Sequence, residues 1–210
     1  MLDASKLHAA EAAFLARFPE GFADPEMQKI GKKHRMTAMI EFARESFSKD
    51  ALSGNVHTAA DNMVKAVSRS SMVSMFEKPK FRDFVNAMDE HEKAFLVNAL
   101  QQQLHGRQAA GFAAMVDILK TGKLAKWSLV SIIPAYYKPT REVFVKPTTA
   151  KGILTFFDIK DPVYHPTPSW DFYRKYRQLI NDGKKEVSKS LSPSNAAFSG
   201  FLMMTVLPAR

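Results

Sequence analysis

Residues 89–106 read DEHEKAFLVNALQQQLHG, and this stretch carries start and stop signals for one helix. Asp89 and Glu92 have the spacing of a capping box, in which two side chains bind free backbone amides at the start of a helix. Apolar residues are frequent from Ala94 to Leu104, and Gly106 follows them, as glycine commonly does where a helix ends. The stretch therefore predicts a helix between Asp89 and Gly106.

Helical patterns recur throughout the first half of the chain. Asp24-Pro25-Glu26 is a typical helix start, because aspartate caps free amides and proline is tolerated in the first turn. Apolar residues at helical spacing predict further helices within 7–18, 36–47, 56–67 and 110–119. No repeat of roughly 20 to 50 residues connects these segments, so a solenoid is not supported. We predict an irregular helical bundle.

The second half changes in character after Trp127. The strongly apolar residues up to 137 predict a buried helix that ends near Pro134. The sequence KPTREVFVKPTT, residues 138–149, then predicts a strand, with Val143 and Val145 on one face.

Pro147 should end this strand. Thr148 or Thr149 can then cap a helix that runs to residue 157, although this short apolar run could equally be a second strand. The fold class predicted from the sequence is mainly α, with a small β element around 141–165.

A last pair of helices is expected near the C-terminus. Thr167-Pro168 is a second cap-and-proline start, and Ser192-Pro193 begins a segment that is apolar nearly all round and should be buried. One face of the helix from Ser169 should pack on that segment. The expected core residues are Trp170, Phe172, Tyr176, Leu179 and Phe198.

The chain has 210 residues, enough for one domain with a sizeable core. We expect a single domain over 1–210, with a neutral helical sub-lobe at 1–122 and a basic one at 123–210. The absence of cysteine suits a reducing compartment. The first residues lack the pattern of a signal peptide, and the longest apolar stretch, 196–207, is shorter than the roughly 20 residues of a membrane span. The sequence predicts a cytoplasmic protein with no membrane partner.

All of the surplus positive charge lies in the second half. Residues 1–105 carry 14 Lys and Arg against 14 Asp and Glu, while residues 106–210 carry 16 against 7. Clustered charge attracts phosphate, so a nucleic acid or another polyanion is the leading partner, with an acidic protein as the alternative. The expected polyanion surface consists of Lys138, Arg141, Arg174, Lys175, Arg177, Lys184 and Lys185.

Three runs of the second half also resemble a known set of sequences. They are KWSLVSIIPAYYKPTREVFVKPTTAKGIL (126–154), YHPTPSWDFYRKYR (164–177) and LSPSNAAFSGFLMM (191–204). Together they resemble the C-terminal part of a family of uncharacterised bacterial proteins, over roughly residues 124–206. The resemblance implies that this half is a unit, and it brings no activity or site residues with it.

The junction at Lys146-Pro147-Thr148-Thr149-Ala150-Lys151 is the best candidate for a site. If a helix begins there, its free amides and dipole, together with Lys146, Thr148, Thr149 and Lys151, would bind an anion such as phosphate. The alternative is a capped helix with two solvated lysines. The junction lacks the glycines of a phosphate-binding loop.

A weaker candidate consists of Glu142, Asp158 and Lys160. Two carboxylates and a lysine on adjacent strands could hold Mg²⁺ and activate water, as in nucleases. The histidines are scattered without a His-x-x-x-His pair, so we predict no metal site, and no cofactor motif is present. The function remains open in the sequence. A polyanion-binding protein leads, ahead of a Mg²⁺-dependent nuclease or phosphate-ligand enzyme and a regulatory subunit that binds an acidic protein.

Overall fold

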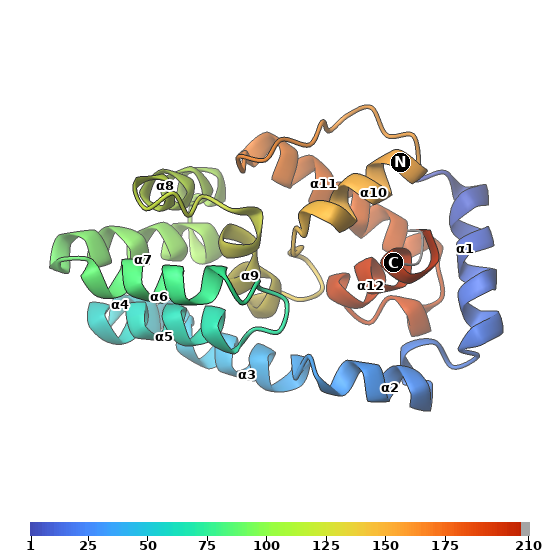
Figure 1. Ribbon diagram of the computed structural model, residues 1–210, viewed down its shortest axis with the longest axis horizontal. Helices are drawn as coiled ribbons and strands as arrows, with labels where there is room; N and C mark the ends of the chain where they lie inside the picture. The colour runs from blue at the N-terminus through green and yellow to red at the C-terminus, as the bar shows by residue number, and fades with distance from the viewer. Residues whose placement is uncertain (207–210) are drawn as a thin grey trace.

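The structure, a computed structural model, describes residues 1–206, which form helices joined by loops with no strand among them (Figure 1). The mainly helical fold predicted from the sequence is confirmed. Short 3₁₀ turns lie at 21–23, 184–186 and 189–191. The α-helices are α1 (Ala4–Arg17), α2 (Pro25–Lys32), α3 (Met36–Ser46), α4 (Lys49–Ser53), α5 (Val56–Arg69), α6 (Glu77–Ala87), α7 (Glu90–His105), α8 (Gln108–Thr121), α9 (Trp127–Tyr137), α10 (Pro147–Phe156), α11 (Trp170–Gly183) and α12 (Asn195–Val206).

Two of the predicted helix starts are confirmed. The start at Thr167-Pro168 is wrong, because Ser169 caps α11, and α9 continues past Pro134 to Tyr137. Asp89 accepts a hydrogen bond from the Glu92 amide at 2.8 Å, and the Glu92 carboxylate accepts one from the Asp89 amide at 3.0 Å. This capping box starts α7, and Gly106 follows its last residue. Asp24 caps α2, whose first residue is Pro25. These signals depend only on neighbouring residues, so the sequence alone can reveal them.

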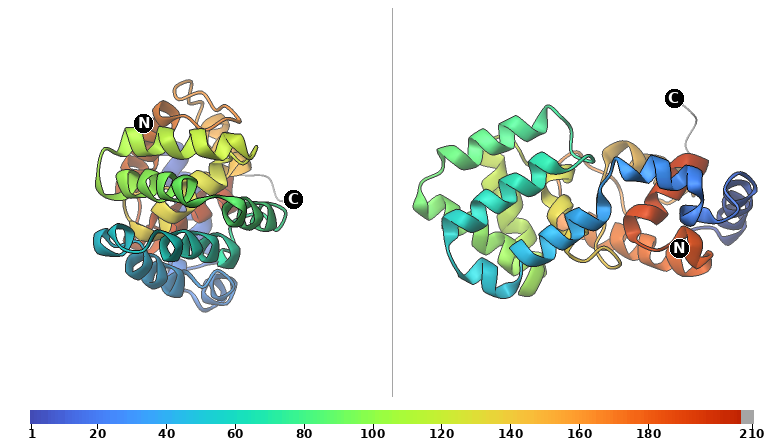
Figure 2. Two further views of the ribbon diagram at one scale, coloured as in Figure 1. Left: turned by 90° about the vertical axis from the view of Figure 1, so that its left-hand side faces the viewer. Right: turned by 90° about the horizontal axis from the view of Figure 1, so that it is seen from below.

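The helices form two groups, which lie side by side in Figure 1 and in the right-hand view of Figure 2. Helices α3–α9 form one group, in which α9 packs against α3, α5, α7 and α8 and is buried from Trp127 to Tyr136 (Figure 1). In the second group α12 packs against α1, α10 and α11, so the two ends of the chain lie together (Figure 2). Each half of the chain thus contributes to both groups, and the packing has no boundary at residue 122.

One continuous apolar core runs through both groups. The closest approach of two helices in it is made by Gly111 of α8. A Cβ atom at this position would lie 2.2 Å from the backbone nitrogen of Gln103 and 2.7 Å from the carbonyl oxygen of Ala99, both on α7. Only glycine lets α7 and α8 pack at this distance.

The β element expected around 141–165 is absent, which corrects the prediction. Residues 143–146 belong to no helix or strand, although Val143 and Val145 are fully buried. Side chains satisfy the backbone instead. Ser131 accepts a hydrogen bond from the Val145 amide at 3.0 Å, and Tyr173 donates one to the Val143 carbonyl at 3.3 Å. Buried backbone groups need partners, and here other helices supply them.

The expected C-terminal core is largely confirmed. Phe172, Tyr176, Leu179 and Phe198 are buried, while Trp170 is half-buried. The all-round burial expected for the last segment is wrong, because α12 is buried on one face only. Met203 and Met204 remain 40% and 36% exposed on the other face.

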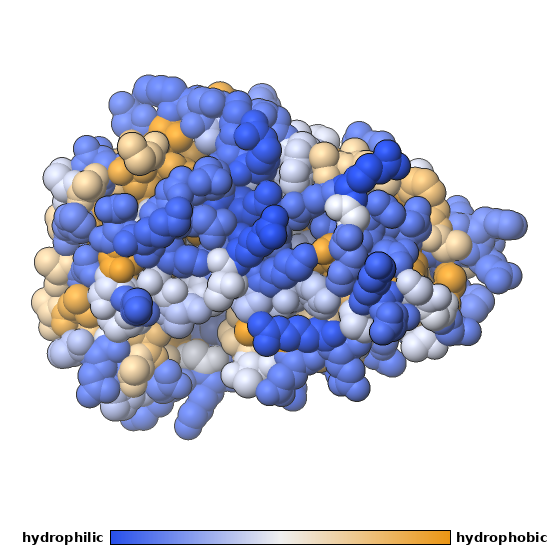
Figure 3. All heavy atoms as spheres, turned by 180° about the vertical axis from the view of Figure 1, so that it is seen from behind, coloured by the Kyte–Doolittle hydropathy of each residue, from blue (hydrophilic) through white to orange (hydrophobic). Residues whose placement is uncertain are grey.

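Among residues 1–206, no helix is long and apolar enough to cross a membrane. Hydrophilic residues cover most of the face seen from behind, and hydrophobic residues lie there in small separate patches (Figure 3).

Candidate anion-binding site

A helix, α10, begins at this junction. Of the two alternatives that the sequence left open, a helix or a second strand, the structure has the helix. The threonine cap is wrong, however: Lys146 precedes the first helical residue, Pro147, and no side chain caps this end. Proline fixes a backbone angle that suits the first helical position, so the helix begins before either threonine. Proline has no amide hydrogen, so the free N–H groups of this first turn belong to Thr148 and Thr149.

The four predicted anion-binding residues have different surroundings. The Thr149 side chain is buried, whereas Lys146, Thr148 and Lys151 are exposed. The Lys151 ammonium lies 5.6 Å from the centre of the Tyr164 ring. Lys146 makes no ion pair with any residue from 1 to 206, so its charge is not neutralised by the part of the chain that the structure describes.

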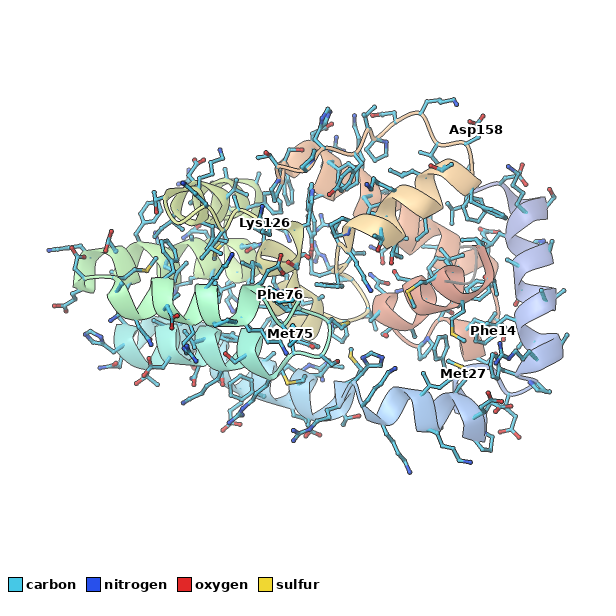
Figure 4. The ribbon with its side chains drawn as sticks, viewed as in Figure 1. Phe14, Met27, Met75, Phe76, Lys126 and Asp158 are labelled. Carbon is cyan, nitrogen blue, oxygen red and sulfur yellow. The ribbon has the colours of Figure 1, made fainter. Side chains whose placement is uncertain are left out.

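Two adjacent hollows meet at Lys146, between the two helical groups. The larger hollow has a volume of about 550 Å³, includes Lys126 and Glu77, and reaches Pro147 and Thr148. The apolar hollow has a volume of about 300 Å³. Lys126 is labelled in Figure 4, between α8 and α10. The residues common to both hollows are Ser71, Met72, Phe144 and Lys146.

The apolar hollow combines residues from distant parts of the chain. Met27 on α2 lies between that helix and α12 (Figure 4). Of the residues that line the apolar hollow within 1–206, only His34 and Lys146 are ionisable, and both are basic. The apolar wall consists of Phe22, Met27, Ile30, Met36, Met72, Phe144, Ala196, Ala197, Met203 and Met204.

His34 lines the apolar hollow and lies close enough to two lysines to be affected by their charges. Its Nδ1 lies 2.8 Å from the Ser71 hydroxyl. The pKa of His34 is lowered from its ordinary value of 6.5, first by partial burial and then by the charges of Lys33 and Lys146. His34 is therefore neutral at pH 7, and a bound anion would offset the repulsion from both lysines.

The Ser71–His34 contact has the distance of a nucleophile and its base, but the rest of a catalytic triad is missing from the described residues. A catalytic histidine is usually oriented by a third group on its second ring nitrogen. No hydrogen bond is formed by His34 Nε2 within residues 1–206. We therefore treat Ser71 and His34 as polar lining of the hollow.

The weaker candidate set is divided between two places. Glu142 is 2% exposed and binds Arg177, with the closest N–O distance at 2.8 Å. Tyr173 donates to the same carboxylate at 2.9 Å, and Gln108 donates to it at 3.1 Å. Burial and the charge of Glu142 raise the pKa of Tyr173 well above its usual range, so the phenol stays protonated and donates.

Asp158 and Lys160 lie outside this cluster. They pair with each other on the surface, at the outer end of α10, where Figure 4 labels Asp158. No contact joins Asp158 to Glu142, and no group of three or more histidine or acidic side chains among the described residues could hold a metal ion. The structure does not bring the three residues together.

Three of the seven cations of the expected polyanion surface are turned inward. Arg177 binds the buried carboxylate described above, and Lys138 donates to a backbone carbonyl of α7. Lys184 donates to the Thr140 carbonyl at 2.6 Å. Burial lowers the pKa of both Lys138 and Lys184. These cations hold the loop between α9 and α10 in place.

Three of the others are paired at the surface. Arg174 and Lys175 contact Asp171 at 3.2 and 2.9 Å, and Lys185 contacts a carboxylate of α11 at 2.8 Å. Hydrogen bonds to Asp161 and then to Asp171 raise the pKa of Lys175. Arg141 is 69% exposed and lies 3.7 Å from the buried Glu142. All seven predicted cations therefore contact an acceptor or a carboxylate within the protein.

Sequence reasoning missed the part of the site that comes from the first half. The run KIGKKHR, residues 29–35, is locally basic although its half of the chain is neutral. It ends beside the apolar hollow, where Ile30 and His34 lie. Counting the charge in short windows, rather than over each half of the chain, would have revealed this run.

Comparisons with protein-family models, curated proteins and solved structures found no match for the chain. The resemblance of residues 124–206 to uncharacterised bacterial proteins stays a prediction.

Proposed function

We propose that this protein binds a small anionic molecule in the apolar hollow, with the charge of the ligand at Lys146. The observation that carries this proposal is the ionisable lining of the hollow, which consists of the basic residues His34 and Lys146 within the described chain. An anion gains from the charge of Lys146 and can accept a hydrogen bond from His34, whereas a cation would meet the repulsion of Lys146.

The start of α10 adds to this preference. Thr149 lines the hollow, and its amide belongs to the free N–H groups of the first helical turn. Free amides and the positive end of the helix dipole favour an anion next to Lys146. A carboxylate or a phosphate has the oxygen acceptors that these donors require.

The wider partners expected from the sequence are less favoured by the geometry. Nucleic-acid binding releases counterions only where cations are free to meet phosphates, and most of the seven predicted cations already have acceptors within the protein. Binding to a polyanion or an acidic protein, Mg²⁺-dependent nuclease activity and a cytoplasmic location remain predictions.

Backbone NMR with butyrate and with inorganic phosphate tests the proposal. We expect millimolar binding that shifts the Thr148 and Thr149 amide signals. Lys146→Gln should weaken it by about tenfold, in line with the loss of one charge-assisted hydrogen bond.

Lys160→Gln is the matched control, because Lys160 is 82% exposed and pairs with Asp158. This variant should bind as the unchanged protein does. Equal binding by Lys146→Gln and the unchanged protein would contradict the proposal, as would shifts confined to α11.

A further inference from the structure

We infer that the ligand is an amphiphilic anion, a carboxylate or phosphate that carries an unbranched hydrocarbon chain of medium length. This inference rests on the proposed function, since it places the charged group at Lys146. It adds the chemical class of the remainder of the molecule, which the apolar hollow would hold.

The wall of the hollow is suited to hydrocarbon. It is built from methionines, phenylalanines and small residues of four separate parts of the chain, with Met27, Met36 and Met72 on one side and α12 on the other. Methionine side chains are flexible and polarisable, so they adapt to chains of different shape. A ligand that covers this wall removes apolar surface from water, which favours binding.

The volume of the hollow limits the length of the chain. At about 300 Å³, the hollow lies at the lower end of the usual size range of ligand pockets. A hollow of this size is suited to a chain of medium length, and decanoate is the longest chain that we expect it to hold.

The position of the charge distinguishes this ligand from a purely apolar one. Lys146 lies where the apolar hollow meets the larger one, so a single molecule can place its chain in the first and its charged group at the border. His34 lies in the same lining, held by Ser71 at 2.8 Å. A neutral hydrocarbon would leave the charge of Lys146 without a counter-charge.

Calorimetric titration with hexanoate, octanoate, decanoate and decanol, below their micelle concentrations, tests the inference on the full chain. Each added methylene should tighten binding by roughly threefold to fourfold. Decanoate should then bind roughly 100-fold tighter than hexanoate. Decanol should bind about tenfold more weakly than decanoate, because it lacks the charge that Lys146 meets.

Gly200→Leu fills the hollow without touching the charge. A Cβ atom there lies 3.7 Å from Phe22, an ordinary contact, so the helix should accept a side chain. In this variant the affinity should no longer increase from hexanoate to decanoate, while butyrate should still bind in the millimolar range. Ala113→Leu, at an exposed position on α8, is the control of equal size and should behave as the unchanged protein does.

The outcomes separate the two proposals. Binding of short anions at Lys146 with no gain from hexanoate to decanoate would overturn the amphiphilic ligand and leave the proposed function standing. Equal binding of decanol and decanoate, unaffected by Lys146→Gln, would overturn both the anion proposal and this inference. The absence of any binding would also overturn both.

Discussion

At the scale of single residues, Glu142 shows how a candidate catalytic group can be a structural one. Its side chain is buried and receives hydrogen bonds from Arg177, Tyr173 and Gln108. The carboxylate therefore has partners for its charge without a metal or a substrate. Sequence reasoning identified Glu142 as a functional candidate but could not reveal its partner Arg177, which lies two helices further along the chain, on α11.

Glu142→Gln should lower the free energy of unfolding by about 3 to 5 kcal/mol, because it leaves Arg177 without its buried counter-charge. Urea unfolding measures this change. Tyr173→Phe removes the hydroxyl that donates to Glu142 and to the Val143 carbonyl but keeps the ion pair, so it should cost less, about 1.5 to 3 kcal/mol. An unchanged unfolding midpoint for Glu142→Gln would show that the ion pair does not hold the fold together.

His34 should make stability depend on pH. Its pKa in the folded protein is below the ordinary value of 6.5, so the unfolded chain binds the proton more readily. The contribution of His34 is therefore present above pH 6.5 and is lost as the pH falls from 6.5 through the lowered pKa. Urea midpoints at pH 8 and pH 5.5 should differ less in His34→Gln than in the unchanged protein. The same pH dependence in both would contradict the assignment.

At the scale of elements, the segment before α10 separates what the sequence could predict from what it could not. The alternation at Val143 and Val145 correctly indicated two residues that are buried. A strand also needs a neighbour for its hydrogen bonds, and that neighbour is not a local property. The helix starts at Asp89 and Asp24 could be predicted, because each of these caps acts on backbone amides within three residues.

Asn195 at the start of α12 provides the test at this scale. Its side chain is 1% exposed, donates to the Glu142 carbonyl at 3.1 Å and accepts from Lys184 at 2.6 Å. Asn195→Ala should cost about 1 to 3 kcal/mol, because it leaves buried polar groups unpaired. Asn181→Ala, on the more exposed side of the same network, should cost less in the same urea experiment. The reverse order would contradict this account of how the segment is held.

At the scale of the whole molecule, the candidate site exists because distant segments meet. Lys146 and Thr149 could be predicted from the sequence, since a proline and two lysines mark the start of α10. The apolar hollow could not, because its wall takes Met27 and His34 from one end of the chain and Met203 from the other. No local pattern shows that these residues are neighbours.

The central claim is that one amphiphilic anion occupies the apolar hollow, and the methionines provide its most direct test. The chain has 11 methionines, of which Met27, Met36, Met72, Met203 and Met204 line the hollow. Met75 is 74% exposed and labelled in Figure 4, and it does not line the hollow, so it serves as the surface control. The measurement is the methyl NMR spectrum of the protein, labelled with ¹³C at its methionine methyl groups, during titration with decanoate.

The account predicts that the signals of the five lining methionines shift together and saturate, while the Met75 signal stays in place. Shifts at Met75 without shifts at the lining methionines, or no saturable shift at any methionine, would contradict it.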